Sequence, residues 1–243
     1  MNNRKLMQLA RDNKRPENGL DVRSEGDDAT IRIYDVIDDW WGVSAESIAR
    51  ALDAITASTI NVRLNCPGGD VFEARAMKTL FETHDAKIIM HVDGLAASAA
   101  SYLMFAGDEK RIANGAMVMI HNPWSFAWGE ASELRKTADL LDKIRDTLAD
   151  DYETATGKAR AEIISWMDAE TWFEASEAVE HGFCDTVVQK GQGASAAASW
   201  NLAAYANTPA PKDRDDAGDI DTEIANVKAK SEARLGLLER TAA

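Results

Sequence analysis

Apolar runs and amphipathic stretches alternate through the middle of the chain. Four apolar or alternating runs predict β-strands, at residues 29–37, 60–65, 87–92 and 116–121. Four stretches with apolar residues at helical spacing predict α-helices, at residues 44–56, 71–84, 98–106 and 130–156. Strands that alternate with helices in this way predict an α/β domain with a largely parallel sheet.

The two ends of the chain differ from this middle in their residue types. Residues 1–28 are polar and contain turn-forming residues, so we expect a mobile arm there. The alternating pattern fills residues 29–190, which we expect to be the folded domain. Residues 191–218 are rich in Ala, Ser, Gly and Pro and predict a linker. Residues 219–243 have apolar residues partly at helical spacing, which predicts a helical tail.

The composition is that of an acidic globular chain. Its 243 residues include 27 Lys and Arg against 41 Asp and Glu, a formal net charge of −14. Because nucleic-acid binding relies on basic patches, this charge argues against a nucleic-acid partner. No stretch resembles a transmembrane helix or a signal peptide, and Cys66 and Cys184 make no disulfide framework. We therefore expect a cytoplasmic protein without a membrane partner.

A glycine pair follows the strand expected at residues 60–65. In open α/β sheets, sites collect at the carboxyl ends of strands. Here the strand leads into Pro67, Gly68 and Gly69 and then into a helix. Glycines allow positive φ and let backbone N–H groups point at a ligand. The alternative is a tight strand-to-helix turn, since neither the Walker A pattern nor the dinucleotide-binding pattern is present.

Ser98 follows the strand expected at residues 87–92, at the start of a helix of small residues. A serine there is close to the positive end of the helix dipole, which favours an oxyanion, and small neighbours leave room for a substrate. The alternative is that Ser98 caps the helix or packs in a helix crossing. Ser101 lies one turn further into the helix and is the weaker candidate nucleophile.

His121 closes the strand expected at residues 116–121, just before Asn-Pro. Histidine has a pKa near neutrality and is the usual general base for a serine. The other histidines are expected in a solvated helix end (His84), a strand interior (His91) and a helix C-terminus (His181). His121 is therefore the candidate base, with a structural role as the alternative.

A serine–histidine pair needs an acceptor that orients the second imidazole nitrogen. Asp168 and Glu170 are candidates, because carboxylates two residues apart in an extended segment face the same way. Either could instead be a surface charge or a helix cap. The sequence has no cluster at metal-ligand spacing, so we expect no metal.

Together these segments resemble the Clp-type serine peptidases and are most similar to their phage branch, the head maturation (prohead) proteases. The resemblance covers roughly residues 30–190. It rests on NCPGGDVF at 65–72, DGLAASAAS at 93–101, MIHNPW at 119–124, MDAETWF at 167–173 and ASEAVEHGFCD at 175–185. The segment DWWGV at 39–43 is similar to the phage branch.

The resemblance implies a catalytic triad. Ser98 matches the nucleophile of the family and His121 its base. The third member of the triad is usually an Asp, and Glu170 stands in its place in this sequence. Glutamate is longer by one methylene and could reach His121 from a more distant backbone. We therefore expect Glu170 to orient His121, with Asp168 as the rival.

The resemblance also implies that the chemistry needs neither a cofactor nor a metal. The backbone N–H groups of Gly69 and Ala99 match the oxyanion hole of the family. Cys66 stands where the family usually has Ser, and we assign it no catalytic role.

The implied fold is a spiral of ββα units, as in Clp peptidases and crotonases, with the helix from residue 130 as a protruding handle. The implied assembly is a homo-oligomeric ring that stacks through these handles. A phage member would cut scaffold and coat proteins in the prohead or the host cytoplasm, without an ATPase partner. The tail after residue 191 would then be a scaffold-like extension or a cleavable segment.

Three rival interpretations stay open. A crotonase-type acyl-CoA enzyme shares the spiral and a two-amide oxyanion hole, but would have carboxylates where Ser98 stands. A relative of the Ser-Lys signal-peptide peptidases would not need His121. A catalytically inactive ring or scaffold subunit is favoured by the presence of Glu170 in place of Asp.

Overall fold

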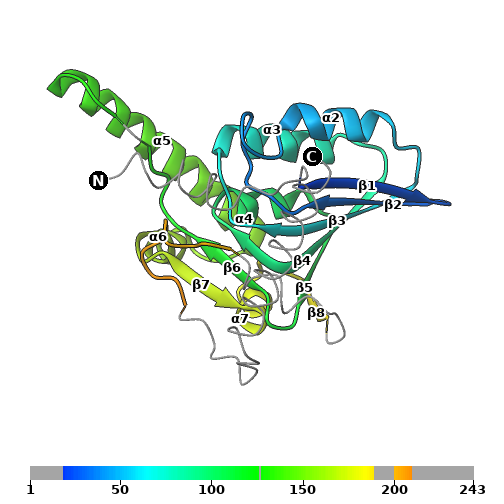
Figure 1. Ribbon diagram of the computed structural model, residues 1–243. Coiled ribbons are helices and arrows are strands. Elements are labelled where there is room, and N and C mark those ends of the chain that lie inside the picture. Colours follow the sequence, from blue (N-terminus) through cyan, green and yellow to red (C-terminus); the bar gives the residue numbers. More distant parts are fainter. Residues whose placement is uncertain (1–18, 126, 189–199, 210–243) are drawn as a thin grey trace, which may run out of the picture. The chain divides into compact units, whose positions relative to one another are not determined.

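The computed structural model describes residues 19–125, 127–188 and 200–209 (Figure 1). In chain order the elements are β1 (Leu20–Glu25), β2 (Asp28–Ile33), α2 (Ala45–Asp53), β3 (Thr59–Cys66), α3 (Val71–Glu82), β4 (Lys87–Ala97), α4 (Ala99–Leu103), η1 (Met104–Ala106), β5 (Glu109–Ala113), β6 (Met117–Ile120), α5 (Ala131–Thr156), α6 (Arg160–Asp168), β7 (Thr171–Glu174), α7 (Ala175–Glu180) and β8 (Thr186–Val188). The expected α/β class is confirmed.

One mixed sheet organises these elements. Its strand order is β1-β2-β3-β4-β5-β8, and β6 pairs with both β4 and β7. Most neighbouring strands are parallel, whereas the β1–β2 and β6–β7 pairs are antiparallel. The long strand β4 pairs with β5 through residues 89–92 and with β6 through residues 95–97. The carboxyl end of β4 therefore lies beside β6.

Alternation along the strands separates an apolar face of the sheet from a polar one. In β3, Ile60, Val62 and Leu64 are fully buried, whereas Asn61 and Arg63 between them are partly exposed. Helices α2 and α3 lie along one side of β1, β2 and β3 in Figure 1. Their buried side chains join the main apolar cluster of the fold; they are Ile48, Leu52, Ala74, Met77 and Phe81.

Local hydrogen bonds explain where these two helices begin. The Ser47 N–H donates to the Ser44 hydroxyl, and the Ser44 N–H donates to the Ser47 hydroxyl, which makes a capping box with Ser in the usual place of Glu. The Asp70 carboxylate accepts the N–H groups of Phe72 and Glu73 at 2.7 and 3.0 Å. Because Asp70 caps α3, the helix starts directly after the glycine pair.

The 26-residue helix α5 extends beyond the sheet, as expected for a handle (Figure 1). Its buried residues all lie in the C-terminal half; they are Ile144, Leu148, Ala149 and Tyr152. In the other half, Leu134 and Leu140 are 44% and 50% exposed. Neither α5 nor any other helix in the described part of the chain combines the length and apolarity that crossing a membrane requires.

The structure places a strand within the expected mobile arm. Residues 20–25 belong to the expected mobile arm, but they form β1 and pair with β2 through a turn at Gly26, whose φ is +61°. The expectation of an arm that extends to residue 28 is therefore wrong for this strand. Residues 1–18 lie outside the described residues.

The expected linker at 191–218 also contains a segment that contacts the core. Trp200 and Tyr205 are each only 8% exposed, because they pack with Leu95, Ala97 and Met119. The rest of the expected linker (191–199 and 210–218) and the expected helical tail at 219–243 lie outside the described residues.

Candidate active site

Ser98 stands at the junction of β4 and α4 in a strained backbone conformation. Its φ and ψ are 54° and −122°, a region that residues other than glycine rarely adopt. Its N–H donates to the Met119 carbonyl at 2.8 Å, and its side chain makes no capping bond to α4. Ser98 thus occupies the N-cap position without acting as a side-chain cap, which leaves its hydroxyl available for another partner.

That partner is His121, which follows β6. Nε2 of His121 lies 2.8 Å from Oγ of Ser98. The parallel register of β4 and β6 pairs Ala97 with Met119, so both strands end at the same edge. The structure therefore brings together the two residues that the sequence singled out as nucleophile and base.

The glycine pair lies against the same site. A Cβ on Gly68 would stand 2.7 Å from the Ala97 carbonyl oxygen, and one on Gly69 would stand 1.9 Å from the carbonyl oxygen of Ile37. Both glycines also have positive φ, of 99° and 147°. The close approach of other backbone groups thus requires glycine here. Gly69 and Ala99, the expected oxyanion donors, line one cavity with Ser98 and His121.

This cavity has a volume of about 470 Å³ and is open to solvent. Besides Ser98 and His121, its walls include Trp124, Trp128 and one side of α5. The α5 side chains in it are Thr137, Leu140, Leu141, Ile144, Leu148 and Tyr152. A cleft with mainly apolar walls and a few converging polar groups suits an extended chain with apolar side chains.

The two candidate acids are not in the extended segment that the sequence predicted. Asp168 is the last residue of α6, and Glu170 has a φ of +49° before β7 begins. Because the chain leaves a helix and turns through a left-handed residue, the expectation that both carboxylates face the same way fails. The Asp168 carboxylate accepts a hydrogen bond from the Asn122 side chain at 2.7 Å.

Glu170 is hydrogen-bonded to residues 206–207, a segment that the sequence did not predict at the site. Its carboxylate accepts the backbone N–H groups of Ala206 at 3.0 Å and Asn207 at 2.6 Å. The ring of Tyr205 lies edge-on to that of His121, with centroids 5.4 Å apart. The sequence offered one signal for this contact: Trp200 and Tyr205 are large aromatic residues in a stretch of mostly small ones, and such residues are often buried.

Neither Ser101 nor the two cysteines is placed to act as a nucleophile. Ser101 is fully buried and donates to the Ser98 carbonyl at 2.6 Å, and its Oγ lies 2.9 Å from the Tyr152 hydroxyl. Burial raises the pKa of the Cys66 thiol to about 12 and that of Cys184 to about 12. Both thiols are therefore protonated near neutral pH.

The remaining histidines lie apart from Ser98 in contacts of their own. Nδ1 of His84 accepts the Ala86 N–H at 3.1 Å. Nε2 of His91 lies 3.0 Å from the side-chain oxygen of Asn61, in the polar face of the sheet. His181 caps the C-terminal end of α7 and packs on Trp166. No group of three or more His, Cys, Asp and Glu in the described residues is arranged to hold a metal ion.

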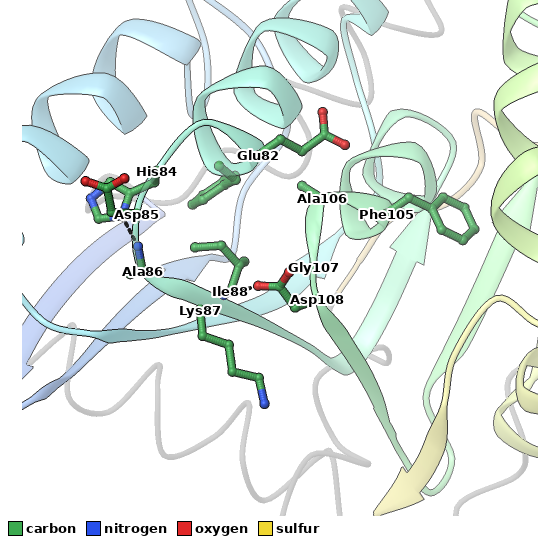
Figure 2. Close-up of a pocket in the computed structure, with 11 residues that line it drawn as sticks. Glu82, His84, Asp85, Ala86, Lys87, Ile88, Phe105, Ala106, Gly107 and Asp108 are labelled. Atoms are coloured by element: carbon green, nitrogen blue, oxygen red, sulfur yellow. Dashed lines mark hydrogen bonds between the residues drawn. The ribbon is translucent and has the colours of Figure 1, made fainter.

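A second hollow, of about 660 Å³, lies between the end of α3 and the start of β4 (Figure 2). Its polar side chains serve the local backbone: Asp108 accepts the Ile88 N–H at 2.8 Å, and His84 bonds to Ala86. It contains none of the residues predicted for catalysis. The cavity at Ser98 is therefore the candidate active site.

Comparison with known proteins identifies relatives of this chain. A family model described as Clp protease matches residues 22–191. The chain is 30% identical over 166 residues to the ATP-dependent Clp protease proteolytic subunit of Bacteroides fragilis, across 67% of this chain and 80% of that protein. It is 29% identical over 168 residues to the same-named protein of Porphyromonas gingivalis, across 68% and 76%. The chain therefore belongs to the Clp protease family.

Proposed function

We propose that the chain is a serine endopeptidase in which Ser98 is the nucleophile and His121 the general base. The observation that supports this most directly is the 2.8 Å contact between their side chains at the wall of an open cavity. The positive φ of Ser98 adds to it, because strained residues in folded proteins cluster at functional sites.

The reaction then proceeds through an acyl-enzyme. Nε2 of His121 takes the hydroxyl proton as Oγ of Ser98 attacks a peptide carbonyl carbon. The N–H groups of Gly69 and Ala99 hold the oxyanion, and loss of one such donor typically costs about 100–1,000-fold in rate. His121 gives its proton to the leaving amine as the C–N bond breaks. A water molecule then hydrolyses the ester, with His121 again as base.

Glu170 is our choice for the group that orients His121, and Asp168 is the rival. Support for Glu170 is its position beside Tyr205, whose ring contacts His121. The negative charge of Glu170 is near enough to contribute to the raised pKa of Tyr205, which is due mainly to burial.

The biological role that we propose is the processing of scaffold and coat proteins during phage head maturation. The phage-like segment at 39–43 supports it. In the fold, residues 39–42 form an exposed turn and Val43 is buried; Asp38, just before the turn, accepts the N–H groups of Trp40 and Trp41, each at 2.8 Å. Particles produced with Ser98→Ala should then retain unprocessed scaffold or coat protein, and unchanged protein masses would exclude this role.

We also propose that the subunits form rings that stack through α5 and that cleavage needs no ATPase. The curated relatives are described as ATP-dependent, which gives the alternative. The purified chain should cut an unfolded protein such as β-casein at the same rate with and without ATP. Cleavage that requires an added Clp ATPase and ATP would favour the alternative.

Covalent labelling tests the chemistry itself. A fluorophosphonate should add once to the wild type, as measured by intact mass, and not at all to Ser98→Ala. His121→Gln should slow labelling by about 1,000-fold or more. Ser176→Ala, which replaces an exposed serine of α7, is the matched control and should react as the wild type does. A folded protein that does not react in the wild type or in any variant would be an inactive subunit.

A further inference from the structure

Residues 200–207, called the strap below, lie against the candidate active site. The Tyr205 hydroxyl donates to the Pro67 carbonyl, immediately before the glycine pair. Its ring contacts the rings of His121 and Trp172, at centroid distances of 5.4 and 5.8 Å. Tyr205 and Ser98 line the same cavity. The strap therefore places one large side chain against His121, in the wall of the cavity that Ser98 lines.

The strap also donates hydrogen bonds to the carboxylate of Glu170, which we expect to orient His121. Both Glu170 oxygens accept strap N–H groups, from Ala206 and Asn207. The Asn207 side chain adds a third bond, to the Ala169 carbonyl at 2.8 Å. Two successive N–H groups hold a carboxylate firmly, because charge-assisted hydrogen bonds are stronger than neutral ones. Each oxygen of the Glu170 carboxylate thus accepts a strap N–H while the strap is in place.

Two buried anchors fix the rest of the strap. The Trp200 indole N–H donates to the Asn65 side chain at 2.9 Å, and Asn65 is itself only 1% exposed. Trp200 and Tyr205 form a small apolar cluster with Leu95, Ala97 and Met119, separate from the main core. The strap therefore has a built seat on the sheet, beside the nucleophile.

The strap does not contact the site in the way that a substrate would. The strap reaches the site through the Tyr205 side chain and through N–H groups that bind Glu170. A substrate would instead present a peptide carbonyl to Ser98 and to the N–H groups of Gly69 and Ala99. Ala206 and Asn207 are exposed, so water can replace their bonds when the strap leaves.

We infer that the strap is a reversible autoinhibitory element: Tyr205 narrows the cavity beside Ser98, and strap N–H groups hold Glu170, until the strap is displaced. This inference rests on the proposed peptidase function. In the closed state Tyr205 fills space beside the nucleophile, and the Glu170 carboxylate accepts hydrogen bonds from strap N–H groups. In the open state the cavity gains room for a substrate chain, and the Glu170 carboxylate is released to orient His121.

The rate of fluorophosphonate labelling of the full chain tests this inference. Since a minor open state typically holds about 0.1–10% of molecules, removal of the closed state should speed labelling by about tenfold or more. Tyr205→Ala removes the aromatic ring that contacts His121 and lines the cavity. Asn207→Pro removes an N–H that binds Glu170 but keeps the tyrosine, so it serves if Tyr205→Ala does not fold. Ala203→Ser, at an exposed strap residue, is the matched control and should label as the wild type does.

A peptide with the sequence of residues 200–209 provides a second readout. Added in excess to Tyr205→Ala, it should slow labelling again, whereas the same peptide with Ala in place of its tyrosine should not. Folded Tyr205→Ala and Asn207→Pro proteins that label no faster than a reactive wild type would overturn the autoinhibitory strap but leave the peptidase intact. No adduct on any folded variant would overturn the peptidase, and the strap inference with it.

Discussion

Oγ of Ser98 lies 2.8 Å from Nε2 of His121, although the two residues are 23 positions apart in the sequence. The contact arises because β4 is long enough to pair with β5 first and with β6 afterwards. The register that joins Ala97 to Met119 brings the next residues of both strands to one edge. The geometry of the pair is thus fixed by backbone pairing of the sheet, which is rigid, and not by a loop.

The Tyr205→Ala variant, in which the strap should be open, can show whether Glu170 or Asp168 orients His121. In Tyr205→Ala, Glu170→Gln should slow fluorophosphonate labelling by about 100-fold or more, because loss of the orienting charge leaves the imidazole in the wrong tautomer. Asp168→Asn should have little effect, since Asp168 bonds to Asn122. The reverse result would assign the role to Asp168, and two unaffected variants would indicate a Ser-His dyad.

The sequence predicted the α/β class, the Ser98–His121 pair and the glycine turn, because each depends on neighbours along the chain or on strand ends that meet at one edge. It failed for the two carboxylates. Their direction is set by the end of α6 and the positive φ of Glu170, neither of which follows from spacing. It also missed the strap, because the side chains of Trp200 and Tyr205 donate hydrogen bonds to residues more than 130 positions away in the chain.

Gly69→Ala should destabilise the fold and abolish labelling together. The new Cβ would stand 1.9 Å from the Ile37 carbonyl oxygen, at a residue whose φ is +147°. We expect a loss of about 2 kcal/mol or more in the free energy of unfolding, measured by urea denaturation. Gly26→Ala is the matched control, since Gly26 also has positive φ but nothing within 4 Å of its Cβ position. It should lose about 1 kcal/mol and keep its reactivity.

The Arg63–Asp93 ion pair should stabilise the polar face of the sheet. Asp93 is 5% exposed and accepts two hydrogen bonds from Arg63, at 2.6 and 2.8 Å, and one from the Tyr34 hydroxyl. Arg63→Met should cost about 1–3 kcal/mol of unfolding free energy, because it leaves a buried carboxylate without its cation. In a double-mutant cycle with Tyr34→Phe, the two losses should not add, since both donors share one carboxylate. Strict additivity would contradict the shared site.

Stability should decrease as the pH falls through the ordinary pKa of histidine, and His91 should contribute to this decrease. Burial lowers the pKa of His91 in the folded state, and the positive charges of Arg63 and Arg111 lower it further. Between that lowered pKa and the unfolded value of about 6.5, the unfolded chain binds more protons, so acid favours unfolding. The drop in unfolding free energy between about pH 7.5 and about pH 5.5 should therefore be smaller in His91→Gln. An equal drop in both proteins would assign the acid sensitivity to other groups.

The exposed half of α5 offers a test of the proposed ring stacking. Leu134 is 44% exposed on a helix whose first buried residue, Ile144, lies more than two turns further along. An apolar side chain at a subunit contact loses binding energy when it becomes charged, because the charge must be desolvated. Leu134→Glu should therefore shift the assembly to smaller species in sedimentation velocity, while the subunit keeps its unfolding free energy. Ser132→Glu adds the same charge on the opposite side of the helix and should leave the assembly unchanged. If Leu134→Glu sediments as the wild type does, stacking does not use this half of α5.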